Sequence, residues 1–222
     1  MTTRGVILDL DGTLVDTNGR HVEAWRRAFA RFGYDVPAAR IGPQIGKGGD
    51  QLVPALIGAE AADRDGEQLR EEHGRQFVAI AAAEAIPVFP GAVELIEALK
   101  RRGVQTALAT SSNDKHLTAT FRSCGVDFAD LVDERTTADD ADASKPAPDL
   151  VHAALAKLGL AAGECAMLGD TPYDGEAAGK AGVRFWAVRC GGFPEEVLKA
   201  AGAAVVLQDP AEVYASLDRL LG

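Results

Sequence analysis

Two carboxylates stand two residues apart in the segment Asp9-Leu10-Asp11-Gly12-Thr13. They directly follow the apolar run Val6–Leu8, and Gly12 permits a tight turn after them. If the chain leaves a buried strand here, both carboxylates can face one point. One could then act as a nucleophile and the other as a general acid and base, and such oxygen ligands suit Mg²⁺. The alternative, a solvated acidic turn, is unusual directly after a fully apolar strand.

Short apolar runs that end in polar or acidic residues recur along the chain. These runs are Val6–Leu8, Ala107–Ala109, Ala166–Leu168 and Phe185–Val188. Continuous apolar runs indicate strands that are covered on both faces. Helical spacing separates them, as at Val93, Ile96 and Leu99. We therefore predict an α/β fold with a doubly wound, Rossmann-like parallel sheet.

The polar residues after these runs are expected to form one site. Ligands of such sheets bind beyond the carboxyl ends of the strands, where Asp9, Thr110 and Asp170 fall. Thr110 can give a hydroxyl, and Ser111 a backbone amide at a helix N-terminus, to a bound phosphoryl group. A Thr-Ser pair is also a common helix N-cap, and that interpretation stays open.

The pattern changes between Thr17 and Ile86, where no strand-like run occurs and helical spacing takes over. Trp25 and Phe29 share one helix face and are expected to be core residues. We predict that residues 17–86 form a helical cap, inserted into a catalytic core made of residues 1–16 and 87–222.

Composition limits the classes of partner. The chain has a formal net charge of −10, which argues against a nucleic-acid surface, so an anionic substrate needs local cations. The three cysteines show no metal-ligand spacing and indicate reduced thiols. The run Val6–Leu8 is too short for a signal peptide or membrane helix. We expect a cytoplasmic protein with no membrane partner; the oligomeric state is open, with a monomer favoured.

The chain resembles the haloacid dehalogenase superfamily, whose phosphatases open with Asp-x-Asp-Gly-Thr, as in Asp9–Thr13. Three later motifs follow in the order and spacing of the family. They are Thr110-Ser111, the segment Ser144–Asp149 with Lys145, and Gly169-Asp170 with Asp174. The helical insert is similar to the cap of the subgroup that holds beta-phosphoglucomutase and phosphoglycolate phosphatase.

This resemblance implies a phosphatase that hydrolyses a sugar phosphate or a phosphoglycolate-like ester through an aspartyl-phosphate. Asp9 would be the nucleophile. Asp11 would protonate the leaving oxygen and then activate water, which requires a pKa raised by neighbouring carboxylates. Asp9, the backbone carbonyl of Asp11, and Asp170 would hold the cofactor Mg²⁺. Asp174 would be a metal ligand, a supporting residue or a first-turn helix acid, and Lys145 would neutralise phosphate charge.

Two cap residues are candidates for substrate binding. His21 matches a cap histidine that the mutases use in proton coupling, although a helical histidine beside arginines is also typical of a surface. Lys47, in the glycine-rich stretch Ile45–Asp50, would contact substrate if this stretch is more than a connecting loop. The mutases place an arginine near this stretch, where glycines stand here, so a phosphatase is favoured over a beta-phosphoglucomutase.

Two further alternatives are less well supported. A phosphonoacetaldehyde hydrolase needs a cap lysine, which Lys47 could supply, but it lacks the second aspartate that stands here as Asp11. A non-enzymatic receiver domain is shorter and has no helical insert after its first strand.

Overall fold

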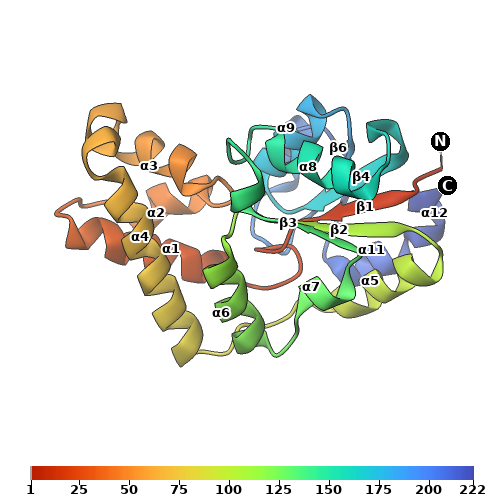
Figure 1. Cartoon of the computed structure of the whole chain (residues 1–222), viewed down its shortest axis with the longest axis horizontal. Helices are drawn as coiled ribbons and strands as arrows, with labels where there is room; N and C mark the ends of the chain where they lie inside the picture. The colour runs from red at the N-terminus through yellow and green to blue at the C-terminus, as the bar shows by residue number, and fades with distance from the viewer. Residues whose placement is uncertain (1) are drawn as a thin grey trace.

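The computed structural model describes residues 2–222 and contains one six-stranded sheet (Figure 1). The strands are β1 (Gly5–Leu8), β2 (Gln105–Ala109), β3 (Glu134–Thr136), β4 (Cys165–Gly169), β5 (Arg184–Val188) and β6 (Ala203–Leu207). Their order is β3-β2-β1-β4-β5-β6, and every neighbouring pair is parallel. The predicted α/β fold class is confirmed.

Helices cover both faces of this sheet (Figure 1). They are α5 (Ala92–Arg101), α6 (Asp114–Cys124), α7 (Phe128–Leu131), α8 (Asp149–Leu158), α9 (Pro172–Lys180), α10 (Glu195–Ala200), α11 (Pro210–Ala215) and α12 (Leu217–Leu221), with short 3-10 turns at Ala138–Asp140 and Ala162–Glu164. Successive residues of β1 face opposite sides, so Val6 and Leu8 pack with α5 and α11 while Ile7 packs with α8. An uninterrupted apolar run is therefore what this central strand needs.

Residues 17–86 contain helices and no strand: α1 (Asn18–Arg31), α2 (Ala38–Ile41), a 3-10 turn (Gly42–Gln44), α3 (Gly49–Ile57) and α4 (Ala59–Ala83). We call this segment the cap. It has its own hydrophobic cluster, in which Trp25 and Phe29 are buried as predicted. Figure 1 shows it beyond one end of the sheet, away from both chain termini.

Two short linkers join the cap to the core and are tied to each other. The Asp16 amide donates to the Pro87 carbonyl at 2.9 Å. The Arg20 guanidinium donates to the carbonyls of Asp16 and Ala85, at 2.7 and 2.8 Å. The entry to the cap and the exit from it are therefore fixed side by side.

Over residues 2–222, no helix combines the length and the apolar character that a membrane crossing requires.

Candidate active site

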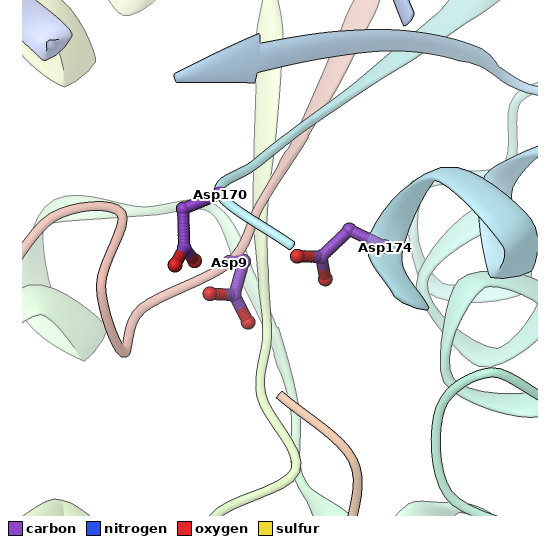
Figure 2. Close-up of side chains that lie close together, drawn as sticks. All are labelled: Asp9, Asp170 and Asp174. Carbon is purple, nitrogen blue, oxygen red and sulfur yellow. The ribbon is translucent and has the colours of Figure 1, made fainter. Parts of the chain in front are cut away.

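Three buried aspartates gather at the carboxyl end of the sheet (Figure 2). Asp9 follows β1 and Asp170 follows β4, and these strands are direct neighbours. Asp174 lies in the first turn of α9. Each residue offers one carboxylate oxygen, and these oxygens lie within 4.8 Å of one another. The parallel topology thus brings together residues that are far apart in sequence, as predicted for Asp9 and Asp170.

A lysine lies between two of these carboxylates. Lys145, which is 1% exposed, donates from Nζ to Asp9 Oδ1 at 2.6 Å and to the Ala109 carbonyl at 3.1 Å. The same Nζ lies 2.8 Å from Asp174 Oδ1. The other oxygen of Asp174 accepts from the Thr171 amide and hydroxyl, at 3.0 and 2.7 Å. One oxygen of Asp174 thus forms an ion pair with Lys145, although it accepts no hydrogen bond within residues 2–222, and the other is held by Thr171, which favours a role in orienting Lys145.

Thr13 joins the other two carboxylates. Its hydroxyl lies 3.2 Å from Asp9 Oδ2 and 3.0 Å from Asp170 Oδ1. Thr13 was not predicted to contact these carboxylates, although its place at the end of the Asp-x-Asp-Gly-Thr motif was a usable signal.

The cluster holds an excess of negative charge. Burial raises the pKa of Asp9 to about 7, although Lys145 opposes this shift, and burial beside Asp9 raises the pKa of Asp170 well above its usual value. Burial lowers the pKa of Lys145, but Asp174 and Asp9 outweigh it and raise the pKa overall. One buried ammonium thus faces three buried carboxylates. A divalent cation with oxygen ligands fits this donor set, because it would offset the remaining charge.

Asp11 lies in a different environment from the other aspartates. Its Oδ1 accepts from the Thr17 hydroxyl at 2.7 Å and lies 3.3 Å from His21 Nε2. Its Oδ2 accepts from the hydroxyls of Ser112 and Thr110, at 2.9 and 3.3 Å. Burial favours the neutral acid, but His21 and these hydrogen bonds outweigh burial and hold the pKa of Asp11 well below its usual range. The predicted upward shift was wrong for this structure, because donors rather than carboxylates contact Asp11.

The hydroxyl segment after β2 is also arranged differently from the prediction. Helix α6 begins at Asp114, and its N-cap is Asn113, whose side chain accepts from the His116 amide. The N-cap interpretation of Thr110 and Ser111 was therefore wrong, and the Ser111 amide precedes the helix. Thr110 is buried and bonds to Asp11, whereas Ser111 Oγ is buried without a hydrogen-bond partner in the described residues. Ser112, which was not predicted, makes a shorter hydrogen bond to Asp11 than Thr110 does.

A cavity of about 320 Å³ lies between the core and the cap. Its lining includes Asp9, Asp11, Ser111 and Ser112 from the core, and His21, Trp25, Lys47, Arg70 and His73 from the cap. Lys47 Nζ donates to Gln44 Oε1 at 2.7 Å and lies 4.7 Å from the centre of the Tyr173 ring. Arg70, on α4, is exposed and makes no hydrogen bond or ion pair within residues 2–222. No sequence signal distinguished Arg70 from the other charges of its helix.

Histidines form one wall of this cavity. His21 is buried, and its Nδ1 lies 3.2 Å from His73 Nε2, so the surface interpretation of His21 was wrong. His73 stacks on Trp25 at 4.0 Å and meets His116 edge to face at 5.5 Å. Burial lowers the pKa of His73 well below its usual value and that of His116 to about 4. His73 and His116 were not predicted, because only the packing of α4 against α1, and of α6 against α4, brings them to His21.

Residues 3–182 match the model of a family described as haloacid dehalogenase-like hydrolase. The chain belongs to this family, as its four motifs predicted, and the predicted enzyme class, a phosphatase of the family, is confirmed.

Individual relatives span most of the chain. It is 30% identical over 226 residues to the phosphoglycolate phosphatase of Rhodospirillum rubrum, covering 99% of this chain and 91% of that protein. It is 31% identical over 196 residues to the plasmid-encoded protein CbbY of Cupriavidus necator, covering 81% and 76%. A solved hydrolase from Pseudomonas syringae superposes with a TM-score of 0.87 and 30% identity, covering 99% of each chain.

Proposed function

We propose that this chain is a Mg²⁺-dependent phosphatase that hydrolyses a small organic phosphate monoester through an aspartyl-phosphate on Asp9. The observation that carries the proposal is the Asp9 carboxylate itself. It is only 6% exposed, it is paired with Lys145, and it lines a cavity whose opposite wall carries cations. A nucleophilic carboxylate has to be shielded from water and has to approach an anion, and this arrangement meets both needs.

The residues of the chain divide the chemistry between them. Asp9 attacks the phosphorus atom, and Lys145 neutralises part of the charge on the phosphoryl oxygens. When bound, Mg²⁺ would be held by Asp9, Asp170 and the backbone carbonyl of Asp11, and it would supply positive charge between the two anions. Asp174 keeps Lys145 in place, which differs from the metal-ligand role that the sequence left open.

Asp11 is placed to move the proton. A phosphate dianion beside it raises its pKa, because a second negative charge disfavours the ionised form. The His21 ring, 3.3 Å away, can supply the proton to Oδ1. Asp11 then gives that proton to the leaving oxygen and takes one from the water that attacks the aspartyl-phosphate. The low pKa of Asp11 in the structure thus describes this carboxyl group before a phosphate enters the site.

The substrate class follows from the cavity between core and cap. Its volume of about 320 Å³ suits a phosphorylated small metabolite. Lys47 and Arg70 stand on the cap side, and they favour an ester whose remote end carries a second negative group. The relative from Rhodospirillum rubrum is named for phosphoglycolate, a substrate of this kind.

A beta-phosphoglucomutase-type transfer is the second candidate, and one observation favours it. The glycine-rich stretch Ile45–Asp50 contains no arginine, which in the sequence disfavours a mutase. In the structure Arg70 comes to this loop from α4, since a Cβ atom on Gly49 would lie 2.8 Å from Arg70 Cγ. A mutase needs such a group to hold a second phosphate while the aspartyl-phosphate persists.

The test is a screen for phosphate release with phosphoglycolate, sugar phosphates and nucleotides. Activity should disappear with a chelator and return with Mg²⁺ but not with Ca²⁺, whose coordination is larger and looser. Full turnover in the chelator would contradict the metal assignment.

Phosphorus NMR with beta-glucose 1-phosphate and a trace of glucose 1,6-bisphosphate separates the two candidates. Near-complete isomerisation with little free phosphate would establish the mutase.

A further inference from the structure

Asn18, the first residue of α1, reaches from the cap into the carboxylate cluster of the core. Its Nδ2 atom donates to Asp170 Oδ2 at 2.9 Å and to the Gly191 carbonyl at 2.9 Å. The Gly191 carbonyl can only accept hydrogen bonds, so the amide nitrogen, which carries two protons, has to occupy this position. The orientation of the side chain is therefore fixed by its partners.

Two glycines leave the space for this contact. A Cβ atom on Gly12 would lie 2.3 Å from Asn18 Nδ2 and 2.4 Å from Asp170 Oδ2. A Cβ atom on Gly191 would lie 1.7 Å from Asp170 Oδ2. Any larger residue at either position would displace the pair. Two separate segments of the core thus leave room for the contact between Asn18 and Asp170.

The carboxylate of Asp170 is held from two sides. Thr13, in the core, donates to Oδ1, and Asn18, in the cap, donates to Oδ2. Within residues 2–222, Asn18 is the only cap side chain that bonds to any of Asp9, Asp170 and Asp174. Because Asn18 begins a cap helix, a movement of α1 would strain this bond.

We propose that Asn18 is a positioning residue that orients Asp170 for Mg²⁺ and couples the metal site to the placement of the cap. The inference rests on the proposed function, because it takes Asp170 as a metal ligand. Partners that orient a ligand typically change metal affinity by ~10–100-fold when they are removed. Coupling is reciprocal, so if the cap holds Asp170 for the metal, the metal also holds the cap.

The first experiment measures Mg²⁺ binding by isothermal titration calorimetry, without substrate or turnover. Asn18→Ala and Asn18→Leu should both weaken binding by about tenfold or more. Leucine is nearly isosteric with asparagine but has no donor, so it separates hydrogen bonding from the filling of space. Gly19→Ala is the matched control, because this position on the same helix faces open space. The control should bind Mg²⁺ within about twofold of the wild type.

The second experiment follows hydrogen exchange of residues 16–24 with and without Mg²⁺. Mg²⁺ should slow exchange in the wild type and in Gly19→Ala, and have little effect in Asn18→Ala. Wild-type affinity in Asn18→Leu, or equal protection in all variants, would overturn the role of Asn18 while leaving the proposed function intact. A wild-type chain that binds no Mg²⁺ would overturn both.

Discussion

The core side and the cap side of the cavity are built in different ways. On the core side, Asp9, Lys145, Asp170 and Asp174 are each at most 6% exposed and tied to one another or to strand ends. On the cap side, the ammonium of Lys47 rests on Gln44, and Arg70 is exposed without a partner in the described residues. Rigid, buried groups suit bond making, whereas long, solvated side chains suit selection among substrates. Substitutions on the two sides should therefore differ in kind as well as in size.

The largest effect is expected for Asp9→Asn. Asparagine keeps the shape of the side chain but lacks the charge needed for attack, so kcat should fall by at least ~10⁴-fold. The fold should survive, because the substitution removes a buried negative charge from a crowded cluster. Steady-state kinetics and thermal unfolding of the purified variant measure both quantities. Substantial turnover in this variant would exclude a covalent intermediate on Asp9.

Lys145→Met should come next, and it tests whether the core side is a single electrostatic unit. Loss of the ammonium leaves Asp9 and Asp174 buried without their cation, which should cost about 3–5 kcal/mol of unfolding free energy. The kcat should fall by ~10²–10³-fold. Lys47→Met is the matched control, and it should change stability by less than ~0.5 kcal/mol. Equal stability losses for both lysines would remove the contrast between the two sides.

Central and edge strands of the sheet differ in how far the sequence could predict them. Strands β1, β2, β4 and β5 were predicted because each is an apolar run that is covered on both faces. Strand β3 (Glu134–Thr136) is a short, polar edge strand, and no pattern of apolar residues marked it. Strand β6 (Ala203–Leu207), at the other edge, is half-buried, and its apolar residues were overlooked.

Site residues could likewise be predicted only where a local pattern in the sequence marks them. Asp9, Asp170 and Thr110 could be predicted, because each directly follows an apolar strand. Lys145 could be predicted only from the resemblance of its segment to a motif of the family. Asn18, Arg70, His73 and His116 could not be predicted, because they come together only through helix packing in three dimensions. The pKa of Asp11 was also beyond the sequence, since it depends on donors from both the cap and the segment after β2.

A smaller effect concerns the histidine wall between the two sides. Burial, together with His21 and Lys115 nearby, outweighs the opposing charge of Asp11 and gives His116 a folded-state pKa of about 4, below the value of 6.5 for an exposed histidine. The unfolded chain therefore binds the extra proton first, so stability is complete above about pH 6.5 and falls as the pH drops toward 4. At pH 5 the loss from His116 should be ~2 kcal/mol.

The check is denaturant unfolding of His116→Gln at pH 7 and pH 5. This variant should lose part of the acid sensitivity of the wild type, and His152→Gln, on the exposed face of α8, should keep it. An unchanged difference between the two pH values in His116→Gln would mean that other groups control acid stability.

The smallest effect is expected at Arg70. Whether substitution changes KM or kcat matters more here than the size of the change. Arg70 lines the cavity but is exposed, so solvent screens its charge and a hydrogen bond to a remote anion of the substrate should be worth only ~1–1.5 kcal/mol. Such a contact acts equally on the bound substrate and on the transition state, because the remote group does not change during phosphoryl transfer. Arg70→Gln should therefore raise KM for phosphoglycolate by about tenfold and leave kcat within about twofold.

A sugar monophosphate with an uncharged remote end should show no change in KM. Arg70→Lys keeps the charge without the bidentate fork and should fall between the two. If instead kcat falls while KM stays constant, Arg70 acts on the reacting atoms, and the division of this cavity into a chemical side and a selective side is wrong.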